Sequence, residues 1–397
     1  MDMKQLRRNA TARDMNVLSC LMYVGFGMHL IARSIILPSI KAEFDITYTQ
    51  TSVIVCASML GYMAMTGLSS LVSRKIGLKN ALTGYIGGLA LVSVLISLCN
   101  SPIQLALLFL CSGGCYGGLD CGLVSMVTLC NPDMHARALT RALAFYSMGS
   151  VLSAVFSGWI VDRGVNWRMP FLMIGLYCML VTLLSMRLLF WEKGTEQRKT
   201  KGQLGRLLQN PLFIYFCALT AVYAGTENVT NNWLTSFLTA VEPDMGLFRS
   251  ACVTALYYMA NVLGRPVLAR LMGRFDNLRL SAATGLSAAF IIFCVSFLQS
   301  AAAMMCCIVL FGVLIAGIYP VLLATSGRVG GEESVFSVTF VTISLCNMGL
   351  NYLVGVVADA TGMAGAFCMN AMLLACVAIG ILVGKRDLDR KDSERPR

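Results

Sequence analysis

Long apolar runs, separated by short polar or basic stretches, dominate the chain. A helix needs about 20 mainly apolar residues to cross a bilayer, so each run predicts one spanning helix. We predict twelve, at Met15–Ile40, Thr51–Val72, Asn80–Leu98, Ile103–Leu129, Ala142–Val161, Met169–Phe190, Pro211–Ala240, Ala251–Leu271, Leu280–Gln299, Ala301–Gly327, Ser334–Ala358 and Thr361–Gly384. The eighth is the weakest because Arg265 and Pro266 interrupt it, but arginines near a span end can reach the membrane interface.

One polar stretch, Trp191–Asn210, is longer than the others and divides the runs into two sets of six. We therefore predict an all-α integral membrane protein without β-sheet. Its six-helix bundles cover residues 1–190 and 211–397, and a cytoplasmic linker covers 191–210. The composition agrees with this class, since 57% of the residues are hydrophobic and 13% are charged, against about 25% charged in soluble domains. The first run is too long for the core of a signal peptide.

The net charge of +11 reflects membrane topology rather than nucleic-acid binding. With twelve spans both termini lie on one side, and basic residues favour cytoplasmic loops. The 31 Lys and Arg residues all fall on the terminal side except Arg33, Lys41, Arg163, Arg168 and Arg249. We therefore expect cytoplasmic termini, a bacterial cytoplasmic membrane and contact with the lipid bilayer, with no nucleic-acid partner. The 16 cysteines and two histidines form no metal-binding pattern, and we interpret the cysteines as packing residues.

Two short motifs repeat at an interval close to half the chain. The fifth run ends in GWIVD, Gly158–Asp162, and the eleventh in GVVAD, Gly355–Asp359. The third and ninth runs also begin with similar stretches, at Leu82–Gly88 and Ala283–Ala289. A parallel repeat of two halves is one recorded transporter plan, with substrate bound between the halves near the membrane midplane.

The chain also carries motifs of a known family. The loop after the second run, SSLVSRKIGLKNALTGY, is similar to a cytoplasmic gating motif, although Ser70 and Arg74 depart from its commonest form. YAGTENVTNNW (Tyr223–Trp233), GIYP (Gly317–Pro320) and GGLD (Gly117–Asp120) are similar to patterns of the seventh, tenth and fourth helices of sugar–proton symporters. The Asn usual four residues after that Asp is Val124 here, and the Gly-Pro pair of antiporters is missing from the fifth run.

On these motifs the chain resembles the major facilitator superfamily, most closely its fucose/glucose-type sugar–proton symporter branch. The resemblance implies secondary active transport by alternating access, with a cavity lined by helices 1, 4, 7 and 10. It also implies a cytoplasmic gate, for which we select Arg74, Lys75, Lys79, Arg137, Arg141, Arg270 and Arg274. We expect a small-molecule substrate, proton coupling, no cofactor and a monomer.

Three charged residues, Arg33, Asp120 and Glu227, lie deep in apolar runs. Each costs about 2.5–3.5 kcal/mol on insertion scales, so each should face a partner or a cavity. They fall on the first, fourth and seventh helices. Polar and aromatic neighbours at helical spacing suit a polyhydroxylated ligand. The predicted substrate-binding residues are Glu227, Asn228, Asn231, Asn232, Trp233, Arg33, Phe26, Tyr319 and Asn347.

Proton coupling requires a group that is charged on one side of the membrane and neutral on the other. We select Asp120 and His29 for this role. The small residues Gly113 and Gly117 share a helix face with Asp120, which predicts room beside the carboxylate. The sugar branch tends to use acids on its first and fourth helices, whereas the first helix here has His29 and Arg33 and no acid.

Several alternatives remain open from the sequence alone. The asparagines can simply link helices, and His29 can be a packing residue. Arg33 in a cavity would also suit an organic anion or sugar acid. A drug or metabolite exporter of the same superfamily and a non-transporting receptor or scaffold are further alternatives. The chain lacks HExxH, GxSxG and P-loop motifs, which argues against a membrane enzyme and against ATP drive.

Overall fold

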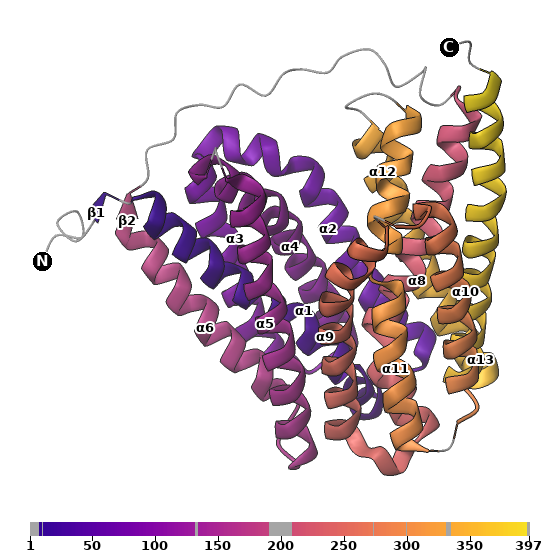
Figure 1. Cartoon of the computed structure of the whole chain (residues 1–397). Helices are drawn as coiled ribbons and strands as arrows, with labels where there is room; N and C mark the ends of the chain where they lie inside the picture. The colour runs from indigo at the N-terminus through magenta and orange to yellow at the C-terminus, as the bar shows by residue number, and fades with distance from the viewer. Residues whose placement is uncertain are drawn as a thin grey trace, which may run out of the picture. The chain divides into compact units, whose positions relative to one another are not determined.

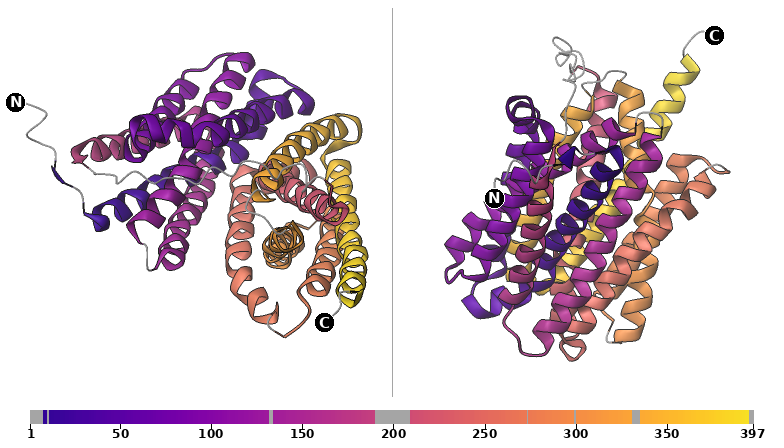
Figure 2. Two further views of the ribbon diagram at one scale, coloured as in Figure 1. Left: turned by 90° about the horizontal axis from the view of Figure 1, so that it is seen from above. Right: turned by 90° about the vertical axis from the view of Figure 1, so that its left-hand side faces the viewer.

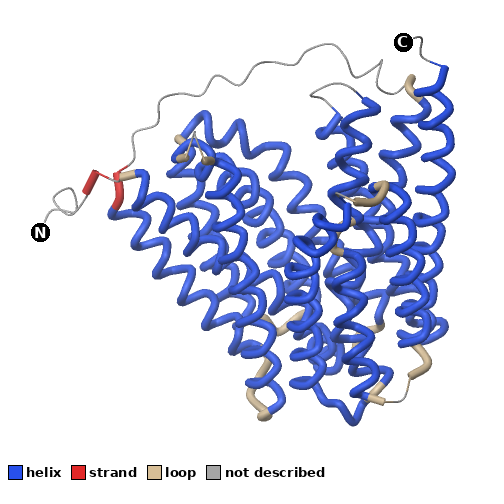
Figure 3. The backbone as a smooth tube through the Cα atoms, viewed as in Figure 1, coloured by secondary structure: helices blue, strands red, loops and turns tan. Residues whose placement is uncertain are grey.

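The computed structural model describes residues 8–9, 11–131, 134–189, 209–272, 274–298, 300–330 and 335–394. Most of the predicted linker, at 191–208, lies outside the described residues, and so does the side chain of Arg137. The described chain is almost entirely helical (Figures 1 and 3). This agrees with the apolar runs read from the sequence.

Most helices follow the predicted runs within a few residues. Those of the first half are α1 (Ala12–Phe44), α2 (Tyr48–Ile76), α3 (Leu78–Ser97), α4 (Pro102–Cys130), α5 (His135–Asp162) and α6 (Arg168–Arg187). Those of the second half are α8 (Pro211–Val241), the short 3-10 helix η2 (Pro243–Met245), α9 (Gly246–Met272), α10 (Asn277–Val295), α11 (Ala301–Ile315), α12 (Ile318–Gly330) and α13 (Val335–Glu394).

Among the described residues, 10 helical stretches are long and apolar enough to cross a membrane. The predicted twelve differ from them in two places. The last two predicted spans run together as α13, which is broken at Gly362, where φ is 78° and ψ is 170°. The interrupted eighth span, α9, is helical through Pro266 but is not among the 10. The count of twelve therefore stays a prediction.

The expectation of no β-sheet is wrong in one detail. Residues Arg8–Asn9 (β1) pair in parallel with Leu188–Leu189 (β2), forming a ladder of two residues a side. These residues flank the start of α1 and the end of α6, where a helix leaves N–H and C=O groups, respectively, without partners of its own.

The described residues group into two compact units. The first contains 8–46, 50–189 and 246–255, and the second contains 47–49, 209–245 and 256–394. The start of α2 therefore groups with the second unit, and the start of α9 groups with the first. The predicted domain boundary near residue 190 lies outside the described residues and stays a prediction.

Within the first unit, α1 is the central helix and packs against α4, α5 and α6. Within the second unit, α8 packs along α13, and α12 lies among α8, α10 and α13 (Figure 2). The 16 cysteines are all free thiols, and three of them, Cys111, Cys306 and Cys376, are exposed.

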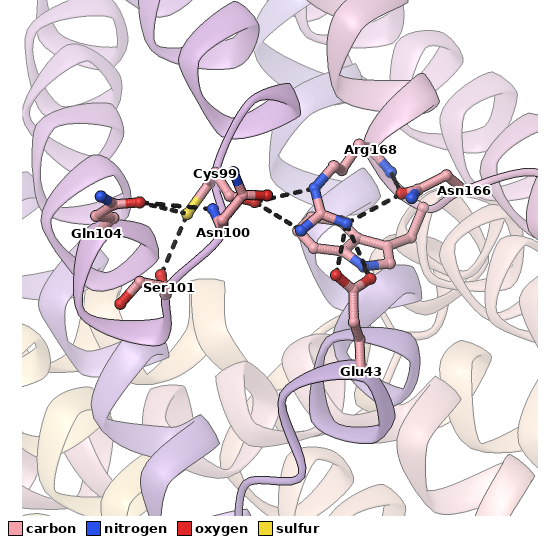
Figure 4. A network of polar contacts seen from close by, with 8 residues as sticks. Glu43, Cys99, Asn100, Ser101, Gln104, Asn166 and Arg168 are labelled. Carbon is pink, nitrogen blue, oxygen red and sulfur yellow. Dashed lines mark hydrogen bonds and ion pairs between the residues drawn. The ribbon is translucent and has the colours of Figure 1, made fainter.

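A network of polar contacts joins three helix ends of the first unit (Figure 4). The guanidinium of Arg168 lies 2.6 Å from the Glu43 carboxylate and donates from Nη2 to the carbonyl of Cys99 at 2.6 Å. Trp167 also donates its indole N–H to Glu43. By binding both partners at once, Arg168 fixes the ends of α1, α3 and α6 against each other with charge-assisted hydrogen bonds.

Candidate functional site

The predicted coupling acid, Asp120, lies half-buried on α4 in the first unit. Its Oδ2 accepts a hydrogen bond of 2.7 Å from the hydroxyl of Tyr62 on α2. Tyr23, on α1, lies near Asp120. Tyr23 is fully buried, and its hydroxyl oxygen has no hydrogen-bond partner among the described residues. The Tyr62 hydroxyl thus hydrogen-bonds Asp120, and Tyr23 from a second helix lies nearby.

The expectation that Gly113 and Gly117 leave room beside Asp120 is wrong. A Cβ atom at Gly117 would lie 2.4 Å from the carbonyl oxygen of Tyr62, and one at Gly113 would lie 1.9 Å from that of Ser58. The space is filled by the backbone of α2. Small residues one turn apart let two membrane helices approach closely, and here they bring Tyr62 against Asp120.

Arg33 and His29 lie on one face of α1, as predicted, but they have different neighbours. Arg33 is 3% exposed and donates from Nη1 to the Ser58 hydroxyl at 2.5 Å. His29 is fully buried, and its Nδ1 is hydrogen-bonded to the Tyr116 hydroxyl. Rings of Phe26 and His29 both contact the Tyr116 ring, with centroids 5.4 and 5.3 Å away. Phe26 and His29 therefore belong to an aromatic cluster.

Glu227 lies half-buried on α8 in the second unit, facing α9. Asn261 and Arg265, both on α9, lie near its carboxylate. Arg265 Nη2 also donates to Asn261 Oδ1 at 3.4 Å. Asn261 was not selected from the sequence, and Arg265 was interpreted only as a residue near a span end. The signal was their spacing of four residues, which places both side chains on one helix face.

Asn231, one turn after Glu227, is held by two tyrosines of α9. Tyr257 donates its hydroxyl to Asn231 Oδ1 at 3.0 Å, and Tyr258 donates to the Asn231 carbonyl at 3.0 Å. Tyr223, one turn before Glu227, donates to the carbonyl of Ile315 at 2.7 Å. The predicted face Tyr223–Glu227–Asn231 therefore exists. The polar groups of Tyr223 and Asn231 on it are hydrogen-bonded to neighbouring helices.

The neighbouring asparagines form a closed network between α8 and α13. Asn351 Oδ1 accepts from Asn232 and from the Trp233 indole, each at 3.1 Å. Asn228 Oδ1 accepts from Asn232 at 2.8 Å and from Asn351 at 3.1 Å. Trp233 and Asn351 are fully buried. These contacts favour the helix-linking interpretation for Asn228, Asn232 and Trp233.

The remaining predicted residues are spread over both units. Tyr319 is half-buried and packs beside Ala221, Ala224 and Ile343. Asn347 Oδ1 is buried and has no partner among the described residues. Of the predicted gate residues, Lys79 is buried, with 8% of its surface exposed. The gate residues that are exposed are Arg74, Lys75, Arg141, Arg270 and Arg274.

Taken by class, this is a polytopic helical membrane protein with ionisable side chains inside its spans. A family model described as the Major Facilitator Superfamily matches residues 17–350. The chain therefore belongs to the Major Facilitator Superfamily and is a transporter of that superfamily.

Two relatives are distant in sequence. The chain is 29% identical over 156 residues to the "Probable vesicular acetylcholine transporter-B" of Danio rerio, an alignment covering 36% of this chain and 29% of that protein. It is 18% identical over 309 residues to the "Protein TsgA homolog" of Buchnera aphidicola subsp. Schizaphis graminum (strain Sg), covering 77% and 78%. The chain thus spans less than a third of the zebrafish protein it matches.

Solved structures share the fold over almost the whole chain. The nucleoside transporter NupG has a TM-score of 0.76 at 12% identity, covering 97% of this chain and 99% of that one. A D-xylose-proton symporter has a TM-score of 0.73 at 11% identity, covering 92% and 96%. A point variant of the E. coli fucose:proton symporter FucP has a TM-score of 0.61 at 17% identity, covering 94% and 99%.

Proposed function

We propose that this transporter moves a small polyhydroxylated solute, a sugar or a related compound, together with protons. The observation that carries the proposal is the pairing of Asp120 with the Tyr62 hydroxyl inside the first unit. A carboxylate among neutral hydroxyls can exist either charged or protonated at modest cost, which a coupling group requires. The names of the fucose and D-xylose symporters of like fold support proton coupling.

In this proposal the two acids inside the spans have separate roles. Asp120 takes up and releases the coupling proton, and the Tyr62 hydroxyl stabilises its charged form. Glu227 binds the solute, helped by Asn231 and by the amide of Asn261. Carboxylate and amide groups give paired hydrogen bonds to neighbouring hydroxyl groups, and aromatic rings cover the apolar face of a sugar.

The remaining predicted residues have supporting roles. Arg33, Phe26, Tyr319 and Asn347 stay proposed as solute contacts, and His29 as a secondary proton group. Asn228, Asn232 and Trp233 act indirectly, by holding α8 on α13. The basic residues of the predicted gate act on the cytoplasmic side.

A second substrate class has its own supporting observation. Arg33 is buried in the first unit and Arg265 lies beside Glu227 in the second. Guanidinium groups bind carboxylates with two parallel hydrogen bonds. An organic anion or sugar acid is therefore the alternative solute, and the relative named as a vesicular acetylcholine transporter widens the range to organic cations.

The setting is proposed with the same topology as in the sequence analysis. The chain is a multi-pass membrane protein, and we place it as a monomer in a bacterial cytoplasmic membrane with both termini in the cytoplasm. Labelling of single engineered tags at each terminus in intact and in opened cells tests the orientation. Labelling of either terminus in intact cells contradicts it.

The function is tested first by binding and then by transport. Purified protein is screened by thermal shift against sugars, nucleosides, organic acids and quaternary amines, because a ligand of the native state raises the melting temperature. The best ligand is then followed in proteoliposomes by equilibrium counterflow and by uptake driven by an imposed pH gradient. Counterflow without gradient-driven accumulation contradicts proton coupling. Counterflow of an organic anion alone selects the second class.

A further inference from the structure

The repeated motif that ends α5 and reappears midway along α13 has a structural role in each unit. In the second unit, the Asp359 carboxylate of GVVAD accepts from two backbone amides. Tyr48 N–H donates to Oδ1 and Thr49 N–H donates to Oδ2, both at 2.8 Å. These amides are the first two of α2, and they group with the second unit. Asp359 thus acts as a helix cap more than 300 residues away in sequence.

The first unit contains the same arrangement with longer contacts. Asp162, the last residue of GWIVD, accepts at Oδ1 from the Phe248 amide at 3.5 Å, near the start of α9. Gly246, which begins α9, has a φ of +67°, and a Cβ there would lie 3.3 Å from Asp162 Oδ1. A Cβ at Gly158 would lie 2.5 Å from the Ala251 Cβ. The glycine of the motif permits close approach, and the aspartate at its end accepts the amide.

The physical effect of these contacts follows from helix termini. The first four N–H groups of a helix have no partner within it, and the aligned peptide dipoles favour a negative charge there. A local cap, such as Thr11 at the start of α1, moves with its own helix. A remote cap exists only while the carboxylate of another helix stays at the helix start. A remote cap therefore stabilises the arrangement in which the two helices lie together, and it is lost when they separate.

We propose that Asp359 and Asp162 are positioning residues of the transport cycle. They are remote caps that hold the first turns of α2 and α9 in one access state and release them in the other, and Asp359 is the stronger of the two. This inference rests on the proposed transport by alternating access but not on the identity of the solute or the coupling ion.

The first test measures the caps directly, by hydrogen–deuterium exchange of the protein in nanodiscs without solute. In Asp359→Ala we expect amides of the peptide covering 46–52 to exchange about fivefold faster or more, as loss of a cap predicts. The peptide covering 246–252 should be unchanged. Asp162→Ala should give the reverse pattern with a smaller factor. Asp359→Asn, which keeps an acceptor oxygen without the charge, should lie between wild type and Asp359→Ala.

The second test separates positioning from simple structural support. Solute affinity of Asp359→Ala should stay within about twofold of wild type, while the counterflow rate should fall several-fold and recover partly in Asp359→Asn. Faster exchange at 46–52 with unaltered counterflow, or unaltered exchange at 46–52, overturns the inference. If no solute shows counterflow, the proposed function fails. In that case, hydrogen–deuterium exchange of the wild-type protein is compared with and without a stabilising ligand from the thermal-shift screen. Equal protection of the peptide covering 46–52 under the two conditions overturns the inference about the caps.

Discussion

The two acids inside the spans of this transporter have contrasting surroundings. In the first unit, Asp120 is bonded by the neutral hydroxyl of Tyr62, which close helix packing at Gly117 brings into place. In the second unit, Glu227 lies beside an amide and a cation, Asn261 and Arg265. A nearby cation favours the charged form of a carboxylate, whereas a neutral hydroxyl can serve both forms. This contrast supports our proposal that the first acid exchanges protons and the second recognises the solute.

The largest expected effect tests the first half of that assignment. Asp120→Asn should abolish uphill accumulation driven by a pH gradient while leaving counterflow within about threefold of wild type, because a group that cannot titrate still lets loaded carrier cycle. Uptake and counterflow are measured in the same vesicles. The matched control is Asp244→Asn, which changes an exposed acid of η2. Wild-type accumulation by Asp120→Asn contradicts the coupling role.

The second prediction tests the other half of the comparison. Glu227→Gln should weaken solute binding about tenfold, the cost of about one good polar contact (~1.4 kcal/mol), because an amide accepts at only one of its two positions. Asn261→Ala should weaken binding in the same direction by a smaller factor. Calorimetry measures both, with Glu242→Gln at the end of α8 as the control. Unchanged affinity in Glu227→Gln shows that this polar stretch only joins helices.

A third prediction asks whether the asparagines next to Glu227 are structural. Asn351→Ala removes the acceptor of Trp233 and Asn232, and should destabilise the protein by about 1–2 kcal/mol, the upper range for hydrogen bonds between membrane helices. Asn347→Ala, one turn earlier on α13, is the control, since its Oδ1 has no partner among the described residues. Thermal unfolding in detergent measures both. An equal change in the two variants argues against the network.

The smallest effect concerns a charge outside the spans. Asp276 caps α10, accepting from the Arg279 amide at 2.9 Å and from the Lys385 ammonium. Slight burial raises the pKa of Asp276, but these hydrogen bonds outweigh it, so its pKa lies below the ordinary value. A lowered folded-state pKa contributes stability above the unfolded-state pKa, and this is lost as pH falls through the folded value. Asp276→Asn should lower the melting temperature slightly at pH 7, and the difference should vanish at strongly acid pH.

The positions of the spans were predictable because crossing a bilayer imposes a length and an apolar composition on each helix. The family was predictable from short motifs, such as Gly117–Asp120, whose residues lie next to one another in sequence. The placement of Arg33, Asp120 and Glu227 inside spans was predictable too, since a charge in an apolar run is visible without a structure.

The partners of those charges were not predictable, because helical spacing tells which residues share a face but not which helix lies opposite. Gly117 was expected to leave space, and tertiary packing fills that space with the backbone of α2. Asn261 lies near Glu227 because tertiary packing brings α9 beside α8. The aspartates of GWIVD and GVVAD were visible as a repeat, but their role depended on which helix begins beside them.

The sequence by itself determined the membrane class, most of the spans and the superfamily, because these follow from local composition and from motifs of adjacent residues. Only the tertiary structure decided which polar groups meet, because hydrogen bonds act over about 3 Å between residues far apart in the chain.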